Sequence, residues 1–178
     1  MATAASLTIE DFERLPDALA LNHELVDGKL VDVSGNTPKH NRLRDLLVFL
    51  LRPAVTEAGG IIIAEQEFDF GGNAHGPDVS LIGAAKLHLL QGDLRVQLFV
   101  PDMAIEIVSR NDTFESLMKK AVRYRNCGTK EVWLFSIGLR QALHLSEQRQ
   151  ALLDEDALFA PAQIPGFCMR IGELLDRP

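Results

Sequence analysis

Two acidic residues in this sequence lie where a carboxylate is difficult to accommodate. Glu106 stands inside the apolar run 103–108, which reads as a buried strand, and a carboxylate there is costly unless a partner compensates its charge. Asp78 follows Pro77 at the start of a second apolar run, 77–82. Two carboxylates, with a main-chain carbonyl and water, make the oxygen-rich site that Mg²⁺ prefers. A metal ion at such a site polarises a phosphodiester and lowers the pKa of the attacking water.

Strand geometry decides which carboxylate can join Glu106. Asp102 shares its face of the strand, because side chains alternate, but it lies roughly 13 Å away, too far to share one ion. Asp78 belongs to another run, and adjacent strands lie about 4.8 Å apart. We therefore expect Asp78 and Glu106 to converge if the two strands are neighbours. The alternative is that Glu106 pairs with a lysine or arginine and that Asp78 only follows a proline turn.

The elements that must position these residues follow from periodicity and capping signals. Apolar residues at helical spacing and turn residues between short apolar runs indicate interleaved helices and strands in one mixed sheet, an α/β or α+β fold. We expect a short helix capped by Thr8, a hairpin turning at Asp27-Gly28, a helix over 38–57 that Gly59-Gly60 ends, a strand over 61–70, a loop over 71–76, strands over 77–82 and 103–108, a helix that Asp112 or Thr113 caps and Cys127-Gly128 stops, strands over 131–137 and 141–147, and a last short helix within 164–175.

The composition fits one compact domain, which we place over residues 1–178, because 47% of the 178 residues are hydrophobic. The net charge of −7 argues against a protein that coats nucleic acid non-specifically. It leaves room for a local basic patch at Lys39–Arg44 or Lys119–Lys130. Two cysteines give neither a disulfide framework nor metal-ligand spacing. No apolar stretch is long enough to cross a bilayer and no signal peptide is recognisable, so we expect a soluble, cytoplasmic protein.

Six motifs occur in an order that resembles one protein family. They are "HELVDGKL", "NTPKH", "PDV", "PDMAIEIVSRN", "KAVRYRNCGTKEVWLFS" and "IPGFCMRIGELL". Together they resemble a widespread bacterial family of restriction endonucleases, described as a domain of unknown function, within the PD-(D/E)XK nuclease superfamily. The match spans nearly the whole chain. It implies a restriction-endonuclease-like fold, in which a central mixed β-sheet is flanked by helices.

The resemblance also assigns roles to individual positions. It implies that Asp78 and Glu106 bind the metal ion, with the backbone carbonyl of Ile107 as a further ligand. The usual superfamily lysine, two residues after the glutamate, is replaced by Val108. In this family the lysine comes from the following helix, and Lys120 matches that position.

Two further positions match the family motifs. Glu24, in "HELVDG", matches an upstream acidic residue that often joins such sites. His40, in "NTPKH", matches a family histidine for which the sequence gives no role.

Helical geometry gives partial support for Lys120. At about 100° per residue, Lys120 and Tyr124 lie on one flank of the apolar stripe and Lys119 on the other, so at most one of the two lysines faces the site. The predicted stripe consists of Phe114, Leu117, Met118, Ala121 and Val122. The pattern alone does not choose between the lysines, whereas the resemblance selects Lys120. The alternative is a solvated Lys120 beside a core Tyr124 whose hydroxyl meets water.

These observations lead to one leading hypothesis and two rivals. The leading hypothesis is an endonuclease that uses Mg²⁺, or Mn²⁺, to cut DNA phosphodiesters and that acts as a homodimer, since a double-strand cut needs two active sites. Its catalytic residues would be Asp78, Glu106, Lys120 and Glu24. The first rival is a catalytically inactive module of the same fold that binds nucleic acid or a protein partner. The second is hydrolysis of a smaller phosphate ester, for which the sequence has no phosphate-binding glycine loop.

Overall fold

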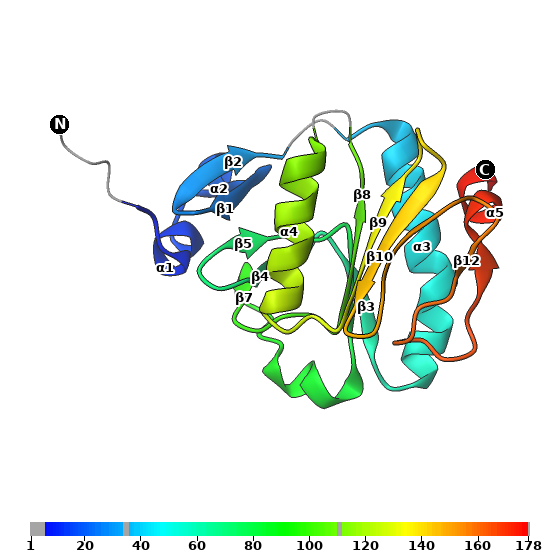
Figure 1. The fold of residues 1–178 in the computed structure, drawn as a ribbon. Coiled ribbons are helices and arrows are strands. Elements are labelled where there is room, and N and C mark those ends of the chain that lie inside the picture. The colour runs from blue at the N-terminus through cyan, green and yellow to red at the C-terminus, as the bar shows by residue number, and fades with distance from the viewer. Residues whose placement is uncertain (1–5, 34–35, 110–111, 178) are drawn as a thin grey trace.

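The computed structural model describes residues 6–33, 36–109 and 112–177, and within them two main sheets and a short third one (Figure 1). The helices are α1 (Ile9–Glu13), α2 (Asp17–Ala20), α3 (Pro38–Glu57), the 3₁₀ helix η1 (Ala84–Leu89), α4 (Phe114–Asn126) and α5 (Ile171–Asp176). The strands are β1 (His23–Val26), β2 (Lys29–Asp32), β3 (Ile61–Ala64), β4 (Glu67–Asp69), β5 (Ala74–His75), β6 (Val79–Ile82), β7 (Val96–Gln97), β8 (Met103–Ile107), β9 (Glu131–Ser136), β10 (Gln141–Ser146), β11 (Gln150–Leu153), β12 (Leu158–Phe159) and β13 (Met169–Arg170). None of the helices in these ranges is long and apolar enough to cross a membrane.

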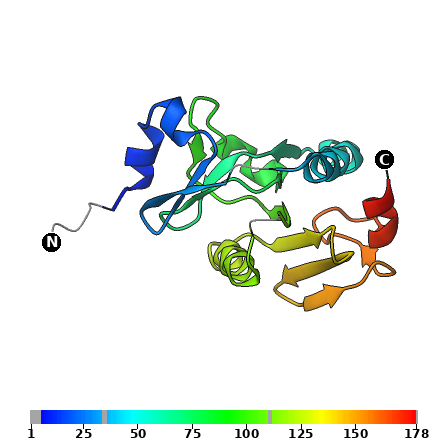
Figure 2. The ribbon, with the colours of Figure 1, turned by 90° about the horizontal axis from the view of Figure 1, so that it is seen from above.

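The larger sheet has the strand order β11-β10-β9-β8-β6-β3, and β8 lies inside it. β8 pairs in parallel with β9 and antiparallel with β6, so the sheet is mixed, as predicted. Because side chains alternate along a strand, Met103, Ile105 and Ile107 pack into the core on the α3 side, while Ala104 packs with Ala121 of α4. Figure 2 shows α3 and α4 nearly end-on, with strands between them. Glu106 consequently faces α4.

The smaller sheet carries the N-terminal hairpin and has the order β2-β1-β5-β4-β7. β1 and β2 pair in the predicted hairpin, and Asp27 and Gly28 have φ values of 48° and 74°, the positive values that a tight turn of this kind requires. Leu25 of β1 packs with Phe12 of α1 in a separate small core. Leu25 is buried on that side, so Glu24, its neighbour, points to the opposite face of the hairpin.

One predicted strand is wrong. Residues 61–70 do not form a single strand, because the chain breaks after β3, where Glu65 has φ 55°, and β4 continues in the other sheet. The Glu65 N–H donates to the carbonyl of Pro77 at 3.2 Å, which holds the break in place. The predicted loop 71–76 also contains the two-residue strand β5. This strand forms because its residues pair with Leu25 of β1 and Phe68 of β4, and its own sequence does not indicate a strand. The break carries the chain from one sheet to the other.

Local capping signals predicted the helices more accurately. Thr8 forms a capping box with Asp11, α3 has the predicted bounds, and Thr113 rather than Asp112 caps α4. The apolar stripe predicted for α4 is wrong at two positions, since Phe114 is 79% exposed and Val122 is 44% exposed. The prediction is confirmed for Ala121, which is buried, and for Leu117 and Met118, which are partly buried beside it. Tyr124, which was not part of the predicted stripe, is buried with them.

A buried carboxylate at the start of β9 fastens the C-terminal segment to the larger sheet. Glu131 accepts hydrogen bonds from the backbone N–H groups of Ala162 and Gln163, both at 3.1 Å, and from Trp133 Nε1 at 2.9 Å. His144 Nε2 lies 2.9 Å from the same carboxylate. Burial raises the pKa of Glu131. The hydrogen bonds from His144, Trp133 and the two backbone groups lower it by more than burial raises it, so the pKa of Glu131 lies below its usual value.

We predict that Glu131→Gln lowers the free energy of unfolding by about 1–3 kcal/mol near neutral pH, because an amide cannot accept all of these donors. A depressed folded-state pKa stabilises the fold above the unfolded-state pKa, about 4.3 for glutamate, and this contribution is lost as the pH falls through the folded value. Denaturant melts of wild type and variant should therefore converge at acidic pH. Glu147→Gln, at an exposed position, is the control. A difference in stability that stays constant down to acidic pH would contradict the assignment.

Candidate active site

Asp78 and Glu106 meet at the end of two paired strands. In the antiparallel pairing of β6 with β8, Val79 lies opposite Ile105, and the same register brings Asp78 opposite Glu106. Both residues are buried, with exposed fractions of 8% and 7%. The condition stated from the sequence, that these two strands are neighbours, is met.

Asp78 is held by two groups of the protein. Its Oδ2 accepts the backbone N–H of Ile107 at 2.6 Å, and its Oδ1 lies 3.2 Å from His40 Nε2. His40 is buried in the first turn of α3, next to the cap Thr37. Burial lowers the pKa of His40, but the hydrogen bond and charge of Asp78, with further hydrogen bonds that include the backbone of Ile107, raise it overall. His40 therefore orients Asp78, a contact that sequence reasoning did not supply.

Glu106 receives two donors from α4. Tyr124 donates its hydroxyl to Glu106 Oε1 at 2.6 Å, and Lys120 Nζ lies 3.0 Å from the same oxygen. The Tyr124 ring is fully buried, so its hydroxyl meets Glu106 rather than water. Lys119 also lines the cleft, but its side chain is 72% exposed and pairs with Glu115. Of the two lysines, Lys120, the one that the resemblance chose, is therefore the one in contact with Glu106.

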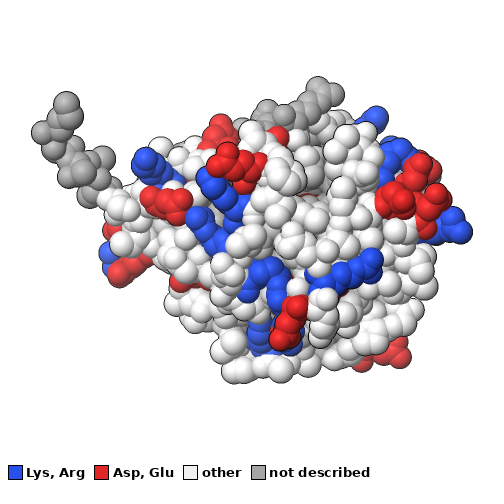
Figure 3. Space-filling view, in the orientation of Figure 1, with Lys and Arg blue, Asp and Glu red and all other residues white. Residues whose placement is uncertain are grey.

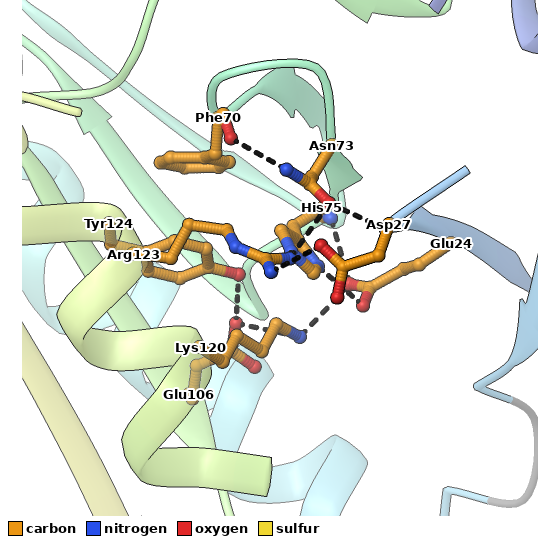
Figure 4. Close-up of polar contacts among 10 residues, drawn as sticks. Glu24, Asp27, Phe70, Asn73, His75, Glu106, Lys120, Arg123 and Tyr124 are labelled. Carbon is orange, nitrogen blue, oxygen red and sulfur yellow. Dashed lines mark hydrogen bonds and ion pairs between the residues drawn. The ribbon is translucent and has the colours of Figure 1, made fainter. Parts of the chain in front are cut away.

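Lys120 also contacts the hairpin of the smaller sheet. Its Nζ lies 2.9 Å from Oε1 of Glu24, which is itself buried. Glu24 Oε1 also accepts the backbone N–H of Gly76 at 3.1 Å, and its Oε2 lies 2.8 Å from His75 Nδ1 (Figure 4). One polar cluster is therefore formed by Glu24 of β1, Glu106 of β8 and Lys120 of α4.

Three residues near this cluster were missed by sequence reasoning: Asn73, His75 and Arg123. Arg123 Nη1 donates to Asn73 Oδ1 at 2.9 Å and lies 3.1 Å from His75 Nε2. The predicted loop at 71–76 concealed the first two. A signal for Arg123 was present, because a residue three positions after Lys120 lies on the same side of a helix.

The charges in the cluster are unequally compensated. Burial raises the pKa of Glu24, yet the charge of Lys120 and the hydrogen bond from His75 outweigh it, so the pKa is lowered. Burial also raises the pKa of Glu106, and there the charge of Lys120 does not offset burial together with the charges of Asp78 and Glu24, so the pKa remains raised. Burial lowers the pKa of Lys120, but Glu106 and Glu24 raise it overall, which keeps the ammonium charged. Glu106 is the carboxylate that a further cation would stabilise most.

The cluster lies in a cleft of about 740 Å³. The hairpin side of this cleft includes the exposed apolar side chains of Leu21, Val31 and Val33. Glu67 also lines the cleft, and burial raises its pKa to about 7. Figure 3 shows acidic and basic side chains interspersed on the face drawn, without one continuous basic surface.

The residues fit a divalent cation bound mainly by oxygen. Within the described ranges, no group of three or more His, Cys, Asp and Glu side chains is placed to hold a metal ion. Asp78 and Glu106 would therefore need main-chain and water ligands as well, as Mg²⁺ usually does. Glu106 Oε2 has no hydrogen-bond partner among the described residues, whereas Oε1 has two. One oxygen of Glu106 is thus left for a ligand.

Comparison with known proteins agrees with this fold. The crystal structure of "a putative nuclease belonging to DUF820" from Anabaena variabilis ATCC 29413 superposes with a TM-score of 0.84 at 22% identity, covering 95% of this chain and 97% of that one. This likeness shows the shared restriction-endonuclease-like fold. A chain of the DrdV–DNA complex matches with a TM-score of only 0.43 at 17% identity, over 79% of this chain and 12% of that one, which is too distant to carry an argument. No curated protein matches.

The family comparison covers most of the sequence. The model described as "Uma2: Putative restriction endonuclease" matches residues 9–171, from α1 to the start of α5. This range contains Glu24, Asp78, Glu106 and Lys120, and it confirms the resemblance found in the sequence. The chain belongs to the Uma2 family of restriction-endonuclease-like proteins.

Proposed function

We propose that this protein is a metal-dependent endonuclease that hydrolyses DNA phosphodiester bonds with Mg²⁺ or Mn²⁺. One observation carries the proposal: Asp78 and Glu106 converge from paired strands in a cleft, and Lys120 of α4 contacts Glu106 there. Membership of a restriction endonuclease family supports a nuclease of this fold.

Asp78, Glu106 and the backbone carbonyl of Ile107 would hold the metal ion. When bound, it would polarise the phosphodiester and make water a better nucleophile. His40 and the N–H of Ile107 fix the two oxygens of Asp78 before any ligand arrives. Tyr124 and Lys120 fix one oxygen of Glu106 and leave the other free of protein contacts in the described chain. The conformational entropy of these carboxylates is thus lost when the protein folds and not when a ligand binds.

Lys120 would stabilise negative charge on the phosphate. An ammonium group has three N–H donors, and Glu24 and Glu106 account for two contacts with Lys120 Nζ. The third is available to a phosphate oxygen, where a charged donor is most effective if charge develops during the reaction. Glu24 would act indirectly, since it anchors Lys120.

The proposed assembly is a homodimer. A single cluster of this kind supplies one cut, and a second copy would supply the site for the other DNA strand. Two-fold dimers are the commonest soluble oligomers.

A second candidate function is a non-catalytic module that binds nucleic acid or a protein partner. The observation in its favour is that the Lys120 ammonium already bridges Glu24 and Glu106, so both carboxylates have a cationic partner without a metal ion. The two functions differ in one testable respect, because a nuclease of this kind needs a divalent metal ion at Asp78 and Glu106.

We predict metal-dependent cleavage that needs both carboxylates. Wild-type protein with Mg²⁺ or Mn²⁺ should cut supercoiled, linear or single-stranded DNA, and Asp78→Asn and Glu106→Gln should each slow the cut at least about 100-fold, as expected for charged groups that act in the transition state. Gel assays with and without a chelator measure this. Glu57→Gln, at an exposed position of α3, should cut like wild type. Cleavage that persists with chelator, or in either site variant, would exclude the proposed site.

We also predict that the two neighbouring lysines differ. Lys120→Met should reduce cleavage by about 10²–10³-fold and lower Tm, because it leaves two buried carboxylates without their cation. Lys120→Arg restores the charge and should recover most of Tm but little of the rate, since the guanidinium places its donors differently. Lys119→Met serves as the matched control and should leave both quantities close to wild type. A greater loss of rate in Lys119→Met than in Lys120→Met would contradict the assignment.

A further inference from the structure

We propose that Arg123 fixes His75 as the neutral tautomer protonated on Nδ1, and that this His75 is a positioning residue for Glu24 and, through it, for Lys120. His75 lies outside the six quoted motifs, and Arg123 lies within the motif over residues 120–136, where the resemblance assigns it no role. Its activity test rests on the proposed nuclease function, whereas the tautomer itself can be measured independently.

Arg123 approaches His75 as a hydrogen-bond donor. A guanidinium has only N–H donors and stays protonated in proteins. Arg123 Nη1 lies 3.1 Å from His75 Nε2 and also donates to Asn73 Oδ1 at 2.9 Å, while Nη2 donates to Asp27 Oδ1 at 2.8 Å. Two fixed acceptors therefore aim the guanidinium at the ring. His75 Nε2 can only be the acceptor in this contact, so it carries no proton.

The other ring nitrogen of His75 must then be the donor. A neutral imidazole with an unprotonated Nε2 carries its proton on Nδ1. His75 Nδ1 lies 2.8 Å from Glu24 Oε2, so it donates to that oxygen. Burial lowers the pKa of His75, the hydrogen bond and charge of Glu24 raise it, and the charges of Lys120 and Arg123 lower it, so that the pKa lies below its usual value, in agreement with a neutral ring.

The proton on His75 Nδ1 fixes the carboxylate of Glu24. Its Oε2 is held by His75, and its Oε1 accepts from Gly76 N–H at 3.1 Å and from Lys120 at 2.9 Å. Both carboxylate oxygens therefore have donors, and the plane of the carboxylate is fixed. With His75 neutral, Glu24 keeps its full charge for Lys120 instead of sharing it with an imidazolium.

The surroundings keep His75 from moving to another partner. Asn73, which aims Arg123, is itself bound to Asp27 N–H at 2.8 Å and to the carbonyl of Phe70 at 3.2 Å. The His75 ring is 3% exposed and packs edge-on against Tyr124 at 5.6 Å between ring centroids. Figure 4 shows this path of contacts from Asp27 to Glu106. Both ring nitrogens are engaged, so His75 positions other groups rather than transferring protons.

The direct test is the tautomer of His75 by NMR. In a long-range ¹H–¹⁵N spectrum of the full chain near neutral pH, we expect His75 to show a protonated Nδ1 and an unprotonated Nε2. Arg123→Gln should change this pattern toward mixed tautomers, because a neutral amide no longer dictates the role of Nε2. Lys119→Gln, on the opposite flank of α4, should leave the His75 signals unchanged. A wild-type ring that is protonated on Nε2, or on both nitrogens, would overturn the proposal.

The second test separates positioning from simple stabilisation. His75→Leu and Arg123→Gln should lower kcat by roughly 10–100-fold with little change in KM, as losses of supporting contacts usually do. His75→Gln, whose amide can donate to Glu24, should recover part of kcat. Variants that lose Tm but keep the wild-type kcat per folded molecule would overturn the positioning role. If wild type does not cleave DNA at all, the nuclease proposal fails, and the NMR result still decides the tautomer.

Discussion

The contact of the partly buried Lys120 ammonium with Glu24 and Glu106 is the interaction on which the site depends. Its two carboxylate partners come from different sheets, and the lysine comes from the helix between them. Removing one member of a buried ion pair leaves an uncompensated charge, which typically costs about 3–5 kcal/mol. The charges therefore remain paired only while the hairpin, the larger sheet and α4 keep their relative positions. The same contacts that join the parts of the fold also assemble the site.

The buried carboxylates around Lys120 carry more negative charge than the lysine compensates, and this excess is the reason to expect a metal ion there. Lys120 faces Glu24 and Glu106, and Asp78 stands beside Glu106. The pKa of Glu106 stays raised because burial and the charges of Asp78 and Glu24 outweigh Lys120. A divalent cation at Asp78 and Glu106 would relieve this excess, which supports the metal-dependent proposal. In the alternative proposal, of a binding module, protonation of Glu106 would relieve it instead.

Sequence reasoning succeeded where structure is decided locally. The Thr8 and Thr113 caps and the turn at Asp27-Gly28 depend on neighbouring residues, and the structure confirms them. The pairing of β6 with β8 was set from the sequence only as the condition under which Asp78 and Glu106 would converge, and the structure meets it. The break at Glu65 was not predictable, because it depends on Pro77, which is distant in sequence.

The site was only partly accessible from sequence. Periodicity placed Lys119 and Lys120 on opposite flanks of α4 but did not tell which flank is buried, and the exposed Phe114 shows that the apolar stripe was misjudged. Resemblance to a family selected Lys120 and Glu24. The contact of His75 with Glu24 depends on the pairing of β5 with β1, and its contact with Arg123 depends on where α4 lies against the smaller sheet, so no local pattern contained them.

The measurement that tests the central claim most directly is the anomalous scattering of Mn²⁺ in crystals of the protein. The account predicts one strong peak within bonding distance of both Asp78 and Glu106, with Lys120 still in contact with Glu24. Peaks only at other positions, or no peak at saturating Mn²⁺ while Lys120 bridges Glu24 and Glu106, would contradict it. That result would favour a module whose carboxylates serve the fold alone.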